Sequence, residues 1–224
     1  MTSYKLITRP FTIACFAFFA LLLTGCAGKV RYPDYYMLAM APSKQVVAND
    51  PGQFATVAVR RFETPAYLRQ GRIVYRQSPQ EIGFYDYHRW ASDPGQIVTL
   101  AVIDALRSTG VFTSVESYDG QDHPEYLLRG RLERLDEVDY NNRVQVEVTM
   151  SAELVNTRTG AVLFAGAVTK TAGVGARDVS SVVAAMSQTS QDSVSQLVAD
   201  MQHRLRKSTV AAGNTGTASA GVNR

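Results

Sequence analysis

The chain has 224 residues, of which 46% are hydrophobic, and this is enough for one domain of moderate size with its own core. Its formal net charge of +3 includes Lys5 and Arg9 of an N-terminal segment that we expect to be removed, and no basic stripe remains that would indicate a nucleic-acid-binding protein. Cys15 lies in that segment and Cys26 directly follows it, so the rest of the chain can form no disulfide, thiol nucleophile or zinc-thiolate site.

The first 25 residues have the pattern of a bacterial lipoprotein signal peptide. The two cations precede an apolar stretch over 11–23, whose length lies within the ~7–15 residues of a secretory signal and below the ~20 that span a membrane. A Leu-Thr-Gly-Cys sequence follows, with the spacing at which the processing peptidase cuts once the thiol is lipidated. We therefore predict cleavage between Gly25 and Cys26 and lipidation of Cys26, the alternative being an ordinary signal peptide with a chance cysteine.

Lipidation would fix the mature chain to a membrane without spanning it. Each buried methylene contributes ~0.8 kcal/mol, so the three acyl chains usual in bacteria hold a protein without measurable dissociation. Ala27 follows the cysteine, where an aspartate commonly retains lipoproteins in the inner membrane, and this predicts the periplasmic face of the outer membrane. The tether over 26–34 has eight residues after the cysteine, which reach at most ~28 Å.

The first half of the folded part contains short strands and one helix. Apolar or alternating stretches predict strands over 35–38, 54–62, 72–75, 81–85 and 111–117. Asp93 and Pro94 have the pattern of a helix start, because aspartate caps free N–H groups and proline suits the first helical position. Gly110 is placed to end this helix.

The second half has the clearer pattern, a meander of three strands followed by a long helix. Strict alternation over 144–154 places apolar residues on one face and polar residues on the other, as in an antiparallel sheet with one wet face. Its neighbours are strands over 128–133 and 161–170. Beyond Asp178, apolar residues recur at helical spacing as far as Leu205. This stripe predicts packing on the sheet, the alternative being a helix offered to a second subunit.

These elements predict an α+β fold, with a mostly antiparallel sheet, a three-strand C-terminal meander and two helices packed on one face. We place the folded domain at 35–207, after the signal peptide over 1–25 and the tether over 26–34. The segment 208–224 is small, polar and rich in glycine, so we expect a disordered tail.

The sequence offers little catalytic chemistry. None of His88, His123 and His203 belongs to an H-E-x-x-H zinc motif, and no G-x-S-x-G elbow is present. The Gly-Val-Gly sequence at 173–175 lacks the third glycine of a phosphate loop. Four acidic residues over 133–139 fit a solvated strand end better than a calcium site. We therefore predict no enzyme activity, no cofactor and no metal.

Four aromatic residues fall within the stretch 84–90, just before the predicted helix. Aromatic side chains and arginine anchor many protein interfaces, and aromatic clusters also close the edges of cores, so both interpretations stay open. On the first interpretation, the candidate partner contacts are Tyr85, Tyr87, Arg89 and Trp90.

Several short motifs behind the lipidation motif resemble, in order, those of one known family. They are Tyr36-Met37-Leu38, Pro65-Ala66-Tyr67-Leu68, Ile73-Val74-Tyr75-Arg76 and Arg89-Trp90-Ala91. Over residues 35–205 the chain resembles the ABC-type transport auxiliary lipoproteins, of which the paraquat-inducible lipoprotein is the best-known member. The family fold, an α+β sheet carrying two helices, agrees with the fold predicted above. The tail after Lys207 and the aromatic-rich stretch over 85–88 depart from the family pattern.

The resemblance implies an outer-membrane component of a system that moves lipids between membranes. Such systems pair an inner-membrane ABC transporter or related permease with periplasmic MCE-domain proteins, and the family is not known for enzymes. The implied partners are an MCE-domain protein, the permease system and, through Cys26, the membrane, while a homo-oligomer would suit a tubular partner. Two alternatives stay open: a lipid-binding carrier with an apolar groove between the sheet and the long helix and, with less support, an envelope hydrolase.

Overall fold

A computed structural model describes residues 31–42, 54–121, 123–140 and 143–217 of the chain. The predicted signal peptide and the predicted lipidation site lie outside these residues. No helix in the part of the chain that the structure describes is both long and apolar enough to cross a membrane.

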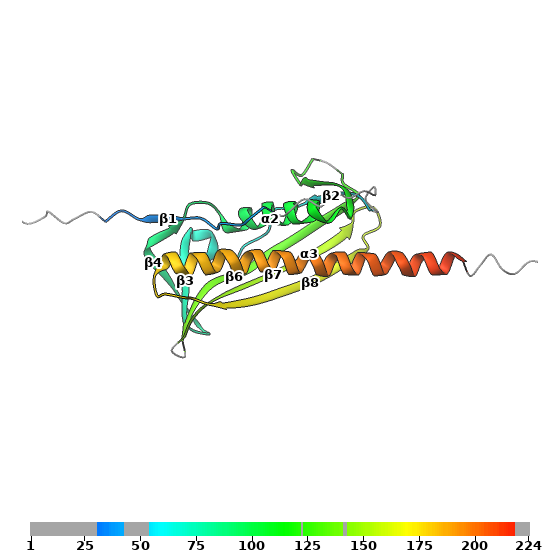
Figure 1. The fold of residues 1–224 in the computed structure, drawn as a ribbon. Helices are drawn as coiled ribbons and strands as arrows, with labels where there is room; N and C mark the ends of the chain where they lie inside the picture. The colour runs from blue at the N-terminus through cyan, green and yellow to red at the C-terminus, as the bar shows by residue number, and fades with distance from the viewer. Residues whose placement is uncertain (1–30, 43–53, 122, 141–142, 218–224) are drawn as a thin grey trace, which may run out of the picture. The chain divides into compact units, whose positions relative to one another are not determined.

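The chain divides into two compact units, Met1–Tyr32 and Pro33–Arg224. All the elements described below belong to the second unit (Figure 1). The strands are β1 Asp34–Tyr36, β2 Phe54–Val59, β3 Arg72–Ser78, β4 Glu81–Trp90, β5 Phe112–Ser117, β6 Tyr126–Tyr140, β7 Arg143–Asn156 and β8 Val162–Gly173. The helices are the short 3-10 helix η1 Leu68–Gln70 and the α-helices α2 Pro94–Thr109 and α3 Val179–Thr217.

The strands form one mixed sheet with two helices packed on one face, which confirms the predicted α+β class. The long pairings are antiparallel: β6 with β7, β7 with β8, and β3 with β4. They include the predicted three-strand meander. Helices α2 and α3 contact each other and both contact β6, so the core lies between this pair and one face of the sheet.

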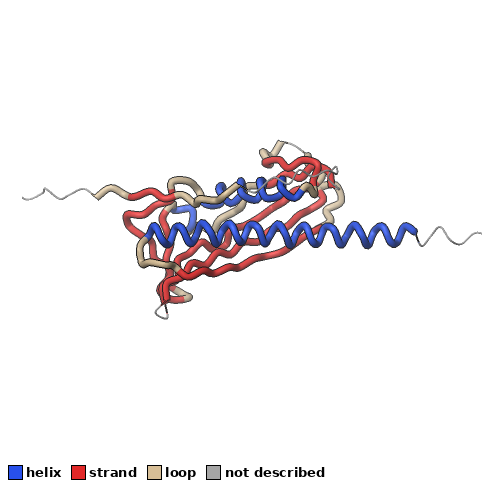
Figure 2. The backbone as a smooth tube through the Cα atoms, viewed as in Figure 1, coloured by secondary structure: helices blue, strands red, loops and turns tan. Residues whose placement is uncertain are grey.

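Strand β6 is the centre of the sheet, because its second edge is shared by two other strands. On that edge β2 pairs in parallel with residues 126–128, and β3 pairs in parallel with residues 136–138. Between them a parallel bridge joins Glu63 to Arg131. The sheet therefore forks, with β5 continuing the branch of β2, and β4 and β1 continuing the branch of β3 (Figure 2).

A register shift in β6 changes which of its residues face the helices. Opposite β7, the pairing passes from Leu132 directly to Arg134, which inserts one extra residue into β6. Because side chains alternate between faces, everything after the shift changes side. Leu135 thus joins Leu132 in the core, and Asp136 turns to the face that carries no α-helix.

Both helices begin where the sequence predicts, and α2 also ends there. The Asp93 carboxylate accepts the Gln96 N–H at the start of α2, and Gly110, with φ 64°, ends the helix. At the start of α3, the Asp178 carboxylate accepts the Ser181 N–H at 2.9 Å. The apolar stripe of α3 is buried in the core, at Val182, Val183, Met186, Val194, Leu197, Val198, Met201 and Leu205.

Three features differ from the sequence-based expectation. Four pairings are parallel, and alternation within single strands does not predict the direction of a neighbour. Strand β4 continues to Trp90 instead of ending at Tyr85. Helix α3 runs to Thr217, so over 208–217 the structure has helix where the sequence predicts disorder. Extending an existing helix needs no new nucleus, which is the costly step in helix formation. Residues 218–224 lie outside the described part.

We predict that replacing Gly130 by alanine destabilises the protein. A Cβ at this position would lie 2.2 Å from the ring of Phe62, which is buried in the core. Overpacking of this kind costs ~1–3 kcal/mol, and we expect a loss of that size in the free energy of unfolding, measured by urea denaturation.

The matched control is Gly173→Ala, where an added Cβ meets no atom within 4 Å. This variant should unfold at the wild-type urea concentration or slightly above it, since alanine restricts the unfolded chain more than glycine. Equal stability of Gly130→Ala and wild type would contradict the close packing of Phe62 on β6.

Candidate functional site at the N-terminal edge of the sheet

Strand β1 brings the chain from the predicted tether into the folded domain and is fixed at several points. It pairs in parallel with the end of β4, and the Ala91 N–H donates to the Tyr36 carbonyl at 2.7 Å. Directly after it, Leu38 is buried in the core, and the Ala39 N–H donates to Ser187 Oγ of α3 at 3.1 Å. The start of the domain is therefore held by both the sheet and the long helix.

His88 lies at the centre of the contact between β1 and β4. Its Nδ1 is 3.1 Å from the Tyr36 hydroxyl and 3.6 Å from a carboxylate oxygen of Asp34. The His88 ring also lies 5.5 Å from the rings of Tyr36 and Tyr85, and Tyr85 packs edge-on against Tyr75 at 5.2 Å. Aromatic side chains from β1, β3 and β4 thus interlock around this histidine.

The four predicted contact residues have different environments. Trp90 is only 6% exposed and belongs to the core. For this residue the structure therefore favours the second interpretation, in which the aromatic stretch closes the edge of the core. Tyr85 and Arg89 are half-buried. Tyr87 is 41% exposed, so among the four it presents the largest apolar area to solvent.

Sequence analysis missed two exposed side chains beside this stretch. Tyr35 is 64% exposed and pairs with Arg89 across the β1–β4 ladder, and Met37 is 59% exposed. They alternate along the chain with the inward-facing Tyr36 and Leu38, a period-2 pattern that could have identified them. We call Tyr35, Met37 and Tyr87 the edge surface.

Behind the aromatic cluster, the Tyr85 hydroxyl donates to Glu137 Oε2 at 2.7 Å. Glu137 lies on β6 and is buried on the helix side of the sheet. Burial raises the pKa of the Glu137 carboxyl above its ordinary value of 4.5, although the hydrogen bond from Tyr85 acts in the opposite direction. Burial, and then the contact with Glu137, raise the pKa of the Tyr85 hydroxyl.

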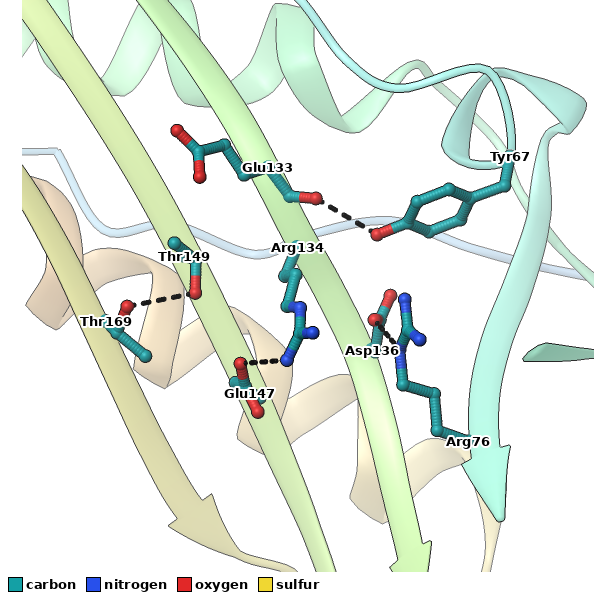
Figure 3. A network of polar contacts seen from close by, with 8 residues as sticks. All are labelled: Tyr67, Arg76, Glu133, Arg134, Asp136, Glu147, Thr149 and Thr169. Atoms are coloured by element: carbon teal, nitrogen blue, oxygen red, sulfur yellow. Dashed lines mark hydrogen bonds and ion pairs between the residues drawn. The ribbon is translucent and has the colours of Figure 1, made fainter. Parts of the chain in front are cut away.

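The neighbouring residue Asp136 is buried on the opposite face of the same strand. Its Oδ2 accepts from Arg76 Nε at 2.5 Å (Figure 3). Tyr67 stands beside this pair, with its ring 5.7 Å from the Arg76 guanidinium and its hydroxyl donating to the Glu133 carbonyl at 3.0 Å. Burial raises the pKa of Asp136 even beside this arginine, and it raises the pKa of Tyr67 to about 12.

The acidic residues over 133–139 are therefore not a simple solvated strand end, as the sequence suggested. Two of them are buried on opposite faces, because the register shift in β6 reverses the alternation before Asp136. Within the described residues, no three side chains of the metal-binding types come together.

Apart from the buried Asp136, the sheet face that carries no α-helix is polar, and its charges are paired. Arg134 contacts Glu147 at 2.6 Å, and the hydroxyls of Thr149 and Thr169 lie 3.1 Å apart (Figure 3). Further along, Arg129 contacts Glu153 at 2.7 Å. Ion pairs near the surface contribute little to stability, and these pairs leave no concentrated charge for a nucleic acid.

The three histidines come from separate parts of the fold. His88 is half-buried on β4, whereas His123 precedes β6 and His203 lies on α3, both exposed. His88 has a carboxylate neighbour in Asp34, but its other described contacts are tyrosines. The geometry of the described residues supports attachment of strands at this edge more than acid–base catalysis.

We predict that Glu137 makes stability depend on pH. In the unfolded chain the carboxyl ionises near 4.5, whereas in the fold burial holds its proton to a higher pH. Between these values the folded state binds more protons, so the free energy of unfolding should fall as pH rises through this window. Glu137→Gln keeps an acceptor for Tyr85 and should remove that part of the fall, measured by urea denaturation across acid to neutral pH.

The control is Glu153→Gln, which replaces an exposed carboxylate on the opposite face. It should follow the wild-type dependence on pH. An unchanged dependence in Glu137→Gln would show that the buried carboxylate is not its source.

A model of the family of ABC-type transport auxiliary lipoprotein components matches residues 36–201. No curated protein matches the sequence significantly. The solved structure of a Xanthomonas campestris DUF330 protein has a TM-score of 0.67 at 16% identity, over 79% of this chain and 98% of that one. Another, of an uncharacterized protein, has a TM-score of 0.58 at 14% identity, over 76% and 99%. These two likenesses concern the fold alone, whereas the family model covers most of the sequence, and the chain therefore belongs to the family of ABC-type transport auxiliary lipoprotein components.

Proposed function

We infer that this chain is a lipid-anchored docking subunit of an ABC-type system that moves lipids between membranes through MCE-domain proteins. On this proposal, acylated Cys26 fixes it to the periplasmic face of the outer membrane, where it receives the end of an MCE-protein assembly. Membership of the family supports an association with a transport system and an anchored lipoprotein. The MCE partner, the choice of membrane and a homo-oligomeric state are parts of the proposal.

The observation that carries the proposal is the fixed entry of the chain at β1. The eight residues 27–34 reach at most ~28 Å from Cys26. They lead into β1 and Leu38, which are held by the sheet and the core. A domain tied this closely stays at the lipid surface and cannot carry cargo freely across the periplasm. Confinement also raises its effective concentration toward any partner that reaches the same membrane.

The edge surface is the docking face that we favour. Tyr35, Met37 and Tyr87 present large apolar area on two adjacent strands, and aromatic residues are enriched among the energetic anchors of interfaces. β1 is also an edge strand, since among the described strands it pairs only with β4. The paired charges on the face of β6, β7 and β8 offer no comparable apolar area.

An auxiliary, non-enzymatic role fits the surroundings of His88. The family is described as a transport auxiliary component, and the histidine of the candidate site contacts strand residues that hold the fold together. We therefore favour docking over the envelope hydrolase.

We predict that Cys26→Ser leaves the protein without acyl chains and with its first 25 residues still attached. Serine cannot form the thioether that carries the acyl chains, and the processing peptidase cuts only once the thiol is lipidated. Mass spectrometry of the purified variant measures both changes, with Ala27→Ser as the control that should be acylated at Cys26 and cut before it. An acylated or normally cut Cys26→Ser protein would contradict the anchor.

We also predict that the edge surface contacts the MCE partner. A photocrosslinking amino acid at Tyr87 or Tyr35 in the native lipoprotein should capture an MCE-domain protein, identified by mass spectrometry. Tyr87→Ala should weaken recovery of that protein about tenfold or more, as expected for an interface anchor.

Leu100, which is 55% exposed on α2, is the matched control position for both experiments. A crosslinker there should capture no MCE-domain protein, and Leu100→Ala should leave recovery unchanged. Equal capture from Leu100 and Tyr87 would remove the edge surface as the docking face.

A further inference from the structure

A groove runs between the beginning of β8 and the second half of α3, away from the edge surface. Its volume is about 460 Å³, which lies within the ~300–1,000 Å³ of small-molecule sites. Strand β8 lies at the end of the sheet and pairs only with β7, and α3 packs along it (Figure 1). The groove is lined by residues 162–165 of β8 and by Asp200, His203, Arg204 and Lys207 of α3.

The strand side of the groove is apolar. Val162 is 54% exposed, one of the most exposed large hydrophobic residues of the described chain, and Leu163 beside it is half-buried. Phe164 follows with its ring in the core. Val162 and Leu163 thus expose apolar area at the groove, and Phe164 also lines it.

The helix side of the groove is cationic. His203, Arg204 and Lys207 are exposed and lie within one turn of one another along α3. The acidic residue of the lining is Asp200, and its carboxylate already accepts from Gln196 Nε2 at 2.8 Å. With Arg204 and Lys207 against this one carboxylate, the groove carries a surplus of positive charge beside its apolar side chains.

The cations of the groove differ in their pairing from those of the sheet face. The described sheet face pairs its arginines with carboxylates, as in Arg129 with Glu153, whereas Arg204 and Lys207 form no ion pair with another described residue. The helix dipole does not account for them either. Its effect is confined to the last turn, and α3 continues ten residues beyond Lys207, to Thr217.

We propose that this groove binds a lipid with one acyl chain and an anionic head. The chain lies along Val162, Leu163 and Phe164, and the head receives charge-assisted hydrogen bonds from Arg204 and Lys207. The site goes beyond the docking function, because its residues are separate from the edge surface and bind whether or not an MCE-domain protein is the partner.

The test measures binding to the chain over residues 26–224 carrying Cys26→Ser, so that neither acyl chains nor the apolar signal segment can occupy the groove. The probe is lysophosphatidylglycerol below its micelle concentration, measured by calorimetry and by native mass spectrometry. Lysophosphatidylcholine with the same acyl chain tests the charge of the head, and inorganic phosphate tests the need for the chain. We expect one lysophosphatidylglycerol per chain, weaker binding of lysophosphatidylcholine and no binding of phosphate.

Variants assign the binding to the groove. Arg204→Glu with Lys207→Glu should weaken lysophosphatidylglycerol binding roughly 10- to 100-fold, as expected for the loss of charged hydrogen bonds. Val162→Asp should weaken both lysolipids. The matched controls are Arg206→Glu, exposed on the same helix outside the groove, and Leu100→Asp, exposed on α2. Circular dichroism confirms that each variant is folded.

Four results would overturn the proposal. They are no lysolipid binding, equal affinity for the two lysolipids, phosphate binding as tight as that of lysophosphatidylglycerol, and an equal loss in Arg206→Glu. Capture of an acidic protein segment at Arg204 without any lysolipid binding would likewise replace the lipid site by a protein interface. None of these results depends on the MCE crosslinking experiment, so the two proposals fail separately.

Discussion

The fold depends on β6 pairing along its whole length with β7 while two other strands share its second edge. The antiparallel pairing supplies the core face on which α2 and α3 pack. The shared edge joins the β2–β5 branch to the β3–β4–β1 branch, so the segment that follows the tether is part of the same sheet as the core. Any change that moves β6 out of register would therefore disturb both the core and the edge surface.

Buried charges fix that register. The shift after Leu132 places Glu137 under Tyr85 on one face and Asp136 against Arg76 on the other. A slip of one residue would exchange these faces and leave both carboxylates without their partners, which is strongly unfavourable for buried charges. We suggest that these contacts select one pairing of the branched sheet more than they stabilise it, since a buried ion pair adds little net stability over a well-packed apolar pair.

The two surfaces of interest lie on different elements and have different chemistry. The edge surface is aromatic, and it belongs to the strands that receive the predicted tether. The groove of β8 and α3 joins apolar side chains to cations. A subunit that received a partner at one surface and held a lipid at the other could couple attachment to delivery. The polar face of β6, β7 and β8, with its paired charges, would then remain in water.

The sequence by itself determined which helices and strands form and where both α-helices begin. The caps at Asp93 and Asp178, the meander and the apolar stripe of α3 follow from periods of two and 3.6 residues, which local backbone geometry imposes. The predicted lipidation of Cys26 likewise rests on a local sequence pattern. The family resemblance rests on short motifs that occur in the family's order, and the family model matches residues 36–201. For the candidate site, the sequence indicated the aromatic stretch over 84–90, but it did not indicate which of its side chains face water.

Only the tertiary structure decided the parallel pairings, the burial of Asp136 and Glu137, the burial of Trp90 and the groove beside Arg204. Each of these results from contacts between residues far apart in the chain. A strand's own pattern shows that one of its faces is dry, but it carries no information about which strand pairs at its edge. One extra residue in β6 then reverses the faces of all that follow, and that shift is fixed by the register with β7 and not by local preference.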